Sequence, residues 1–210
     1  QCHVEYYFKG KDKQLVYPWA KGIKIENIMA VYDEAQHKDW VHAATGAPVL
    51  GYRAPSFSIG ERNGWAFRTI AQAGYRYSSS VYPIRHDHYG MPDAPRFAHE
   101  PVPGLLEIPV ATVRALNVNW PAGGGGYFRL LPYCLSRWSL RRINGHDGRP
   151  AMFYLHPWEI DATQPRVPGL TRATRFRHYL NLHRTHARLT RLMADFRWDR
   201  ADRVFLGGAA

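Results

Sequence analysis

Cysteine is scarce in this sequence: Cys2 and Cys134 are the only two among 210 residues. They lie far apart and follow no metal-ligand spacing, which excludes a disulfide framework and favours either a reducing compartment or a protein indifferent to the redox state of its compartment. The sequence also lacks any apolar run near the roughly 20 residues of a membrane-spanning helix. Its start does not show the basic segment followed by an apolar one that marks a secretory signal. These absences predict a cytoplasmic protein without a membrane span.

Acidic residues are also few, since 17 Asp and Glu stand against 28 Lys and Arg and give a formal net charge of +11. Many of the arginines lie in the last quarter of the chain. A basic surface of this kind attracts nucleic acid, anionic lipid or acidic polysaccharide. A solvated basic helix face is the alternative. We do not expect a nucleic-acid partner, because the arginines are not accompanied by a helix-turn-helix, zinc-finger or single-strand-binding pattern.

Length and composition fit one globular domain over residues 1–210, with 45% hydrophobic and 14% aromatic residues. Strand-like and helix-like segments alternate, which predicts an α/β fold with mainly parallel strands. A proline-containing irregular excursion is expected over 81–103, and long loops of this kind usually carry function. The strands are expected at 4–8, 49–53, 75–79, 106–113 and 152–155, and the helices at 25–44, 65–74, 128–142 and 173–196.

The most informative segment is Met-Phe-Tyr-Leu-His-Pro-Trp-Glu at 152–159. Its four apolar residues predict a strand buried on both faces, with His156 directly after it. α/β proteins bind ligands in the loops that follow the carboxyl ends of parallel strands. An imidazole there can transfer protons near neutral pH. A histidine that only hydrogen-bonds a loop is the alternative. A second apolar run, 49–53, likewise ends in a charged residue, Arg53.

These two segments resemble motifs of the NodB-type polysaccharide deacetylases. Arg-Ala-Pro-Ser at 53–56 resembles the third motif of that family, and Leu-His-Pro at 155–157 resembles the fifth. The resemblance covers residues 46–200 and is closest to the subgroup found with bacterial exopolysaccharide and exosortase loci, whereas residues 1–45 are divergent or shortened. It implies a distorted (β/α) barrel, shortened or incomplete because the chain is too short to supply every strand. The similarity also extends over 74–90, 92–97, 107–110, 125–129 and 176–181.

The resemblance implies an activity and a set of site residues. Members of the family are hydrolases of carbon–nitrogen non-peptide bonds, and they remove N-acetyl groups from an N-acetylated polysaccharide or oligosaccharide, here in exopolysaccharide biosynthesis. A divalent metal, usually zinc, polarises the amide and acidifies a water, a carboxylate takes the proton, and a histidine protonates the amine. By resemblance, His156 is the general acid, Arg53 orients the catalytic carboxylate, and Glu5 is a ligand or the base. The implied substrate-binding residues are Tyr52, Pro55, Ser56, Gly125, Gly126, Tyr127, Leu155 and Trp158.

The metal motifs of that family are degenerate or missing in this chain. The first motif, roughly Asp-Val-Glu-Asp-Tyr-Phe, is best matched by residues 3–8, where both aspartates are replaced. The histidine pair of the second motif does not occur before Arg53. A histidine–aspartate–histidine triplet in the irregular loop offers another ligand set, because zinc accepts both residue types. The metal ligands therefore stay open, with the candidates His3, Glu5, His86, Asp87 and His88.

Several functions remain open at this point. The protein is either an active deacetylase, an inactive relative of the family that keeps its contacts with the glycan, or a basic nucleic-acid-binding protein. The chain opens with Gln-Cys-His instead of methionine, and we expect a further segment upstream. If the resemblance holds, Arg53 and His156 open onto one cleft, lined also by Trp158 and part of the loop 82–89 and approached by Glu5 from the first strand.

Overall fold

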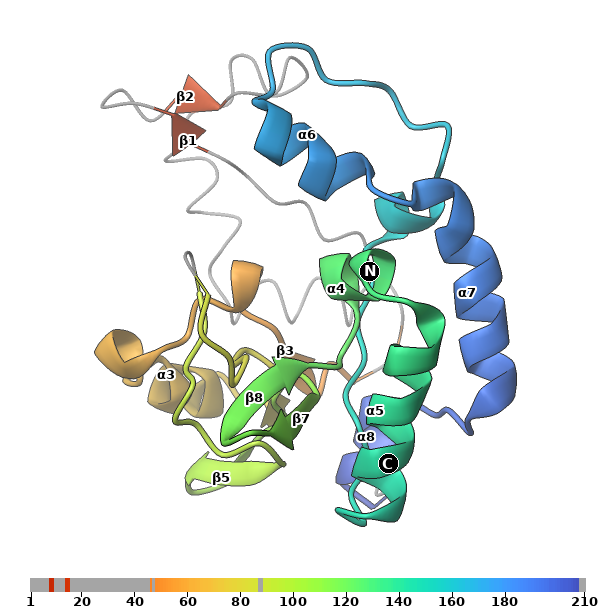
Figure 1. Ribbon diagram of the computed structural model, residues 1–210. Helices are drawn as coiled ribbons and strands as arrows, with labels where there is room; N and C mark the ends of the chain where they lie inside the picture. Colours follow the sequence, from red (N-terminus) through yellow and green to blue (C-terminus); the bar gives the residue numbers. More distant parts are fainter. Residues whose placement is uncertain (1–7, 10–13, 16–45, 47, 87–88, 208–210) are drawn as a thin grey trace.

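The structure is a computed structural model that describes residues 8–9, 14–15, 46, 48–86 and 89–207 (Figure 1). The expected helix at 25–44 lies outside the described residues, as does all of the expected strand at 4–8 except its last residue. The strands are β1 (Phe8–Lys9), β2 (Gln14–Leu15), β3 (Gly51–Tyr52), β4 (Tyr77–Ser78), β5 (His99–Val102), β6 (Leu105–Glu107), β7 (Thr112–Ala115) and β8 (Val118–Pro121). The helices and 3₁₀ turns are η2 (Pro55–Phe57), η3 (Glu61–Asn63), α3 (Ala66–Gln72), α4 (Gly125–Leu130), α5 (Tyr133–Gly145), η4 (Pro157–Ile160), α6 (Arg172–Tyr179), α7 (Leu182–Asp195) and α8 (Ala201–Phe205).

The fold is mixed α/β with small sheets. Strands β3, β4 and β6 pair in parallel, and β5 closes one side by pairing antiparallel with β6. Strands β7 and β8 form a separate hairpin, joined by a turn in which Leu116 and Asn117 both have positive φ. The shortened (β/α) barrel and the single domain over residues 1–210 stay predictions.

Helix α3 occupies the place that the sequence predicts for a helix ending at Gly74. It buries Phe67 and Ile70, and the chain leaves it through Gly74, whose φ of +79° a residue without a β-carbon adopts freely. Those two side chains pack with Tyr75, Val81 and Leu105 in a core cluster beside the four-stranded sheet. The crossover from β3 through α3 therefore sets β4 next to β3, so that the carboxyl ends of both strands lie at one edge.

Four expected elements differ from the structure. The strand at 106–113 is two strands, since β6 ends before Pro109, which has no N–H for a ladder. The helix at 128–142 is α4 and α5, which separate at Pro132. The helix at 173–196 is α6 and α7, with Asn181 left-handed between them. The segment 152–155 forms only isolated parallel bridges, at Met152 and Tyr154.

The two longest helices form a second layer. Helices α5 and α7 run side by side along one flank of the molecule (Figure 1). Leu140 and Ile143 of α5 pack with Leu192 of α7 and with Phe128 in a second core cluster, which the partly buried segment around Phe153 also joins. None of the helices between residues 48 and 207 that the structure describes has the length and apolarity of a membrane span.

Candidate functional site

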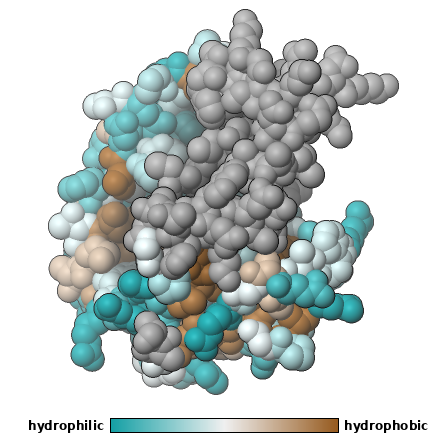
Figure 2. All heavy atoms as spheres, turned by 180° about the vertical axis from the view of Figure 1, so that it is seen from behind, coloured by the Kyte–Doolittle hydropathy of each residue, from teal (hydrophilic) through white to brown (hydrophobic). Residues whose placement is uncertain are grey.

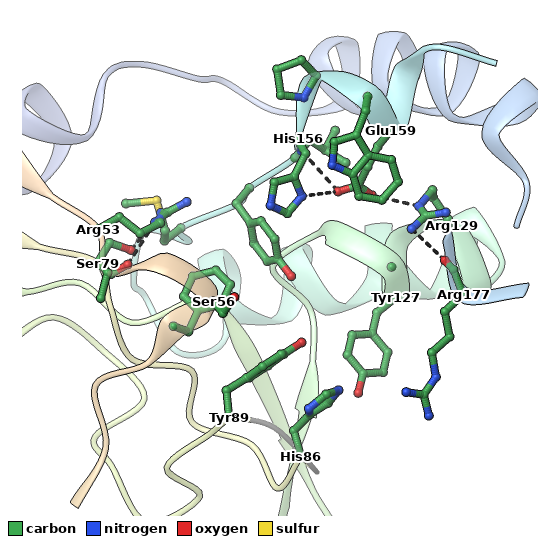
Figure 3. Close-up of a pocket in the computed structure, with 18 of the residues that line it drawn as sticks. Arg53, Ser56, Ser79, His86, Tyr89, Tyr127, Arg129, His156, Glu159 and Arg177 are labelled. Carbon is green, nitrogen blue, oxygen red and sulfur yellow. Dashed lines mark hydrogen bonds and ion pairs between the residues drawn. The ribbon is translucent and has the colours of Figure 1, made fainter. Parts of the chain in front are cut away.

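A cleft of about 1150 Å³ opens between the ends of β3 and β4 on one side and the segment 152–159 on the other. Arg53 follows β3, and Ser79 follows β4. The loop that carries His86 and Tyr89, the first residues of α4 and the carboxyl end of α6 complete the wall. Figure 3 shows these side chains facing a shared space from segments far apart in the sequence.

The structure brings many of the sequence-predicted site residues into this cleft. Pro55 and Gly125 are not among those that line it: Pro55 is exposed on η2, and buried Gly125 lies against the Tyr154 ring. The catalytic and binding roles of all these residues stay predictions. The predicted residues that line the cleft are Tyr52, Arg53, Ser56, His86, Gly126, Tyr127, Leu155, His156 and Trp158. The predicted residues outside the described part of the chain are His3, Glu5, Asp87 and His88.

Arg53 is fixed by the strand beside it. Its Nε donates to the Ser79 carbonyl oxygen and its Nη2 to Ser79 Oγ, both at 2.9 Å. Within the described part of the chain these bonds go to Ser79, and not to the carboxylate that the predicted orienting role requires. Burial lowers the pKa of Arg53, while Tyr154 and the buried carboxyl of Glu107 act to raise it. An arginine stays protonated in proteins, so Arg53 brings a fixed positive charge to the cleft.

Glu107 lies beneath this end of the cleft and is fully buried. Its Oε1 accepts the backbone N–H groups of Ser80, at 2.8 Å, and Val81, at 2.9 Å. Burial raises the pKa of Glu107 despite these hydrogen bonds. The carboxyl thus shapes the turn after β4, from which Ser79 holds Arg53.

His156 belongs to a buried ion-pair network. Its Nδ1 lies 2.8 Å from Glu159 Oε1, and Glu159 Oε2 accepts from Arg129 Nε at 2.8 Å. The turn η4 creates this contact, because Pro157 begins it and Glu159 folds back onto the backbone N–H of His156. A carboxylate oxygen at this position favours the Nδ1–H tautomer, in which Nε2 carries the lone pair of the neutral ring. The carboxylate of Glu159 thus fixes the orientation of the His156 ring in the wall of the cleft.

Arg129 connects this network to the carboxyl end of α6. Its Nη1 donates to the carbonyl oxygens of His178, at 2.8 Å, and Leu180, at 3.1 Å. Its Nη2 donates to that of Arg177 at 3.0 Å. The side chain is 3% exposed, so these bonds satisfy a charge withdrawn from water. Arg129 therefore holds in place both the Glu159 carboxylate and the carboxyl end of α6, which forms part of the cleft wall.

Trp158 lies between two imidazole rings. It stacks on His156 at 5.6 Å and on His178 at 4.3 Å between ring centroids, with interplanar angles of 19° and 14°. The guanidinium of Arg129 lies over the same indole at 5.1 Å. Burial, with the charge of Arg129, lowers the pKa of His178 below its usual value, so the neutral ring prevails at neutral pH. The stack fixes Trp158 as one wall of the cleft.

The floor of the cleft is aromatic and its rim is cationic. Tyr154 packs edge-on against Phe57 at 4.8 Å, and His86 stacks on Tyr89 at 3.9 Å. Burial raises the pKa of Tyr154 well above its usual value, so the hydroxyl stays protonated. The described residues that line the cleft include four arginines but only one acidic residue, Glu159. The arginines are Arg53, Arg85, Arg129 and Arg177.

Sequence reasoning missed three members of the site: Arg129, Glu159 and His178. A local signal existed for Glu159, because His-Pro-x-Glu has the spacing of a residue that folds back on the start of a turn. Arg129 and His178 gave no such signal, since the bonds of Arg129 join residues 30 or more positions apart.

These features define a mixed α/β protein with an aromatic, positively charged cleft. Residues 79–206 match the family described as Domain of unknown function (DUF3473), and the chain belongs to that family. Residues 1–66 match a second family, Cytochrome c552, so the two matches do not overlap. No solved structure matches the chain.

The curated relatives resemble the first part of the chain. Cytochrome c-552 of Porphyromonas gingivalis is 44% identical over 73 residues, which are 35% of this chain and 15% of that protein. Cytochrome c-552 of Haemophilus ducreyi is 50% identical over 58 residues, 28% of this chain and 11% of the relative. That of Bacteroides fragilis is 44% identical over 73 residues, with 35% and 15% covered. The chain thus spans at most about a seventh of these relatives.

The identification as a NodB-type polysaccharide deacetylase was wrong. The matching families are DUF3473 and Cytochrome c552, and the named relatives are cytochromes c-552. The same matches contradict three further predictions: the carbon–nitrogen hydrolase activity, the role in exopolysaccharide biosynthesis and the zinc cofactor. They also contradict the alternative of an inactive member of that family. They do not support a nucleic-acid-binding protein. The identification depended on two short motifs and on the similarity over 74–90 and the other separate segments, whereas the histidine pair of the second metal motif was absent from the first 52 residues.

Proposed function

We propose that the cleft binds a ligand in which rings carry carboxylate or phosphate groups. The observation that supports this most directly is the composition of the wall, with four arginines, aromatic faces and one carboxylate that Arg129 already pairs. Arginine pairs with carboxylate and phosphate through two parallel hydrogen bonds, and flat aromatic faces pack against rings. Binding sites commonly have volumes of about 300–1000 Å³, so this cleft has room for several linked rings.

Two classes of ligand carry carboxylate or phosphate groups on rings, acidic oligosaccharides and nucleotides, and the experiment below distinguishes them. The N-acetylated polysaccharide or oligosaccharide expected from the sequence remains a proposal, and it belongs to the first class if it also carries acidic groups. In both cases Arg53 and Arg177 contact the acidic groups, and Tyr127 and Trp158 pack against the rings. His156 lines the cleft with its Nδ1 held by Glu159, and its role in proton transfer remains a prediction.

The exposed rim arginine Arg177 provides the first test. Its side chain extends beside Tyr127 (Figure 3), so Arg177→Gln should weaken binding of an acidic ligand about tenfold. Isothermal titration with uronic acid oligomers, nucleoside diphosphates and neutral sugar oligomers measures this. Arg175→Gln, an exposed position on the same helix that does not line the cleft, is the matched control. Equal affinity for neutral and acidic oligomers, or equal losses in both variants, would contradict the proposal.

Haem binding by the first part of the chain is a second candidate function, which we infer from the names of the curated relatives. Cys2-His3 equals the last two residues of the Cys-x-x-Cys-His motif that attaches c-type haem. The described residues do not fit such a group. Their cysteine, Cys134, is exposed on α5 and followed by Leu135, and no cluster of three metal-ligating side chains occurs among them. No chemical step is therefore assigned to haem.

This candidate makes a separate prediction about two residues. If residues 1–66 hold haem, the full chain purified from cells that make c-type cytochromes shows haem absorbance, and His3→Ala removes it. Cys134→Ser should leave the absorbance unchanged, because that residue lies in α5 away from any such motif. The absorbance of the pyridine complex measures haem content. This candidate function would be contradicted if the wild-type chain from those cells contained no haem. It would also be contradicted if Cys134→Ser lost haem while His3→Ala kept it.

A further inference from the structure

Helices α5 and α7 carry an unbalanced set of charges. Together they contain six arginines, and Asp195 is their one acidic residue. Arg188 is turned inward, where its Nη1 donates to the carbonyl oxygens of Phe128 and Arg129 at 3.0 Å and of Leu131 at 3.1 Å. The remaining arginines are Arg137, Arg141, Arg142, Arg184 and Arg191.

Asp195 shows that the arginines of the two helices form one surface. Arg137 of α5 pairs with its carboxylate at 2.9 Å. The Tyr133 hydroxyl donates to the same carboxylate, and this bond, together with the charges of Arg137, Arg191 and Arg141, holds the pKa of Asp195 below its usual value. Three arginines from both helices thus surround one carboxylate, which leaves excess positive charge.

A large apolar side chain lies on the same surface. Trp138 is 50% exposed. Trp138 and Arg141 are three residues apart on α5 and both exposed, so they share a face of the helix. The guanidinium of Arg142 lies over the Trp138 ring at 5.9 Å. We call the surface formed by Trp138, Arg137, Arg141, Arg142, Arg184 and Arg191 the α5–α7 face.

We propose that the α5–α7 face binds peripherally to a bilayer that contains anionic lipids. The excess arginines complement anionic headgroups, and Trp138 can enter the headgroup region beside them. Two helices lying side by side on the flank of the molecule present an outward face that suits an extended surface (Figure 1). Seen from behind, hydrophilic residues lie beside hydrophobic ones along the left edge of the molecule (Figure 2).

Flotation of the full chain with lipid vesicles tests this proposal. We expect binding to phosphatidylcholine vesicles that contain phosphatidylglycerol, loss of binding at high salt, and no binding to phosphatidylcholine alone. Arg141→Gln should lower the partition coefficient about fivefold, and the double variant Arg141→Gln/Arg184→Gln about 25-fold. Trp138→Ala should weaken vesicle binding but leave binding to soluble heparin unchanged, because only a bilayer takes up the indole.

Arg68→Gln is the matched control, since Arg68 is exposed on α3 outside the α5–α7 face. It should change the partition coefficient less than Arg141→Gln does. Circular dichroism confirms that each variant is folded. Equal partition of the Arg68 and Arg141 variants, equal binding to neutral and anionic vesicles, or tighter binding to an RNA oligonucleotide than to anionic vesicles would overturn the proposal.

Discussion

Replacing Arg129 with methionine is expected to lower the free energy of unfolding by about 3–5 kcal/mol, because removal of one partner leaves a buried charge without compensation. The Glu159 carboxylate is 1% exposed and would lose the Nε donor at 2.8 Å. The carbonyl oxygens of Arg177, His178 and Leu180 would also lose their bonds to this guanidinium. Urea unfolding followed by circular dichroism measures the change.

The double variant Arg129→Met/Glu159→Leu separates the two parts of this loss. It should recover part of the stability, because replacing both members of a buried pair by apolar residues is far less costly than breaking the pair. The remaining deficit measures the carbonyl groups left without donors. Arg175→Met, at an exposed position, should change stability by less than about 0.5 kcal/mol. A loss below about 1 kcal/mol in Arg129→Met would contradict the role given to this network.

Gly124→Ala is expected to destabilise the protein by about 3 kcal/mol or more, since its backbone angles belong to a region that essentially only glycine occupies. Gly124 has φ of 104° and ψ of −149°. A β-carbon there would collide with the carbonyl oxygen of Tyr154. That oxygen accepts from Gly125 N at 3.1 Å, and Tyr154 N donates to the Gly123 carbonyl oxygen at 2.8 Å. The substitution therefore separates α4, which carries Arg129, from the segment that carries His156.

Gly148→Ala is the control for backbone conformation alone. Gly148 also has a positive φ, of +62°, but a β-carbon there meets no atom within 4 Å. We expect a loss of about 1–2 kcal/mol, the usual cost of a left-handed residue with a side chain. Thermal unfolding of both variants gives the comparison. Similar losses at the two positions would show that the contact between Gly124 and Tyr154 matters little.

Local patterns in the sequence were sufficient for some elements of the fold. The expected helix at 65–74 contains α3, and the expected strands at 49–53 and 75–79 contain β3 and β4. Patterns failed where an apolar run continues across a backbone interruption. Pro109 and Pro132 divide such runs, and Asn181 turns the chain between α6 and α7 without any proline. The pattern of apolar residues continues across these positions and does not reveal where the backbone is interrupted. One long element was therefore predicted where the structure has two short ones.

The candidate site was predicted in part for a general reason. Arg53 and His156 each follow an apolar run, and such positions meet at one edge in α/β proteins. Arg129 was not singled out, because its importance depends on burial and on partners 30 or more residues away. The assigned family failed for a different reason: it was inferred from two short motifs and several separate segments, whereas the matches to DUF3473 and Cytochrome c552 extend over 128 and 66 residues, the spans of 79–206 and 1–66.

The attachment of α6 has a consequence for motion. This helix has no buried residue along Arg172–Tyr179, and its carboxyl end is tied to α4 through the bonds that Arg129 makes to its carbonyl groups. Helices with little buried surface open locally at a lower free energy than the core. We therefore expect the amide protons of α6 to exchange with solvent through local opening. Those of Leu140 and Leu192, in the helical core, should exchange only through global unfolding. We therefore expect the width of the cleft to vary with local opening of α6, which the bonds from Arg129 oppose.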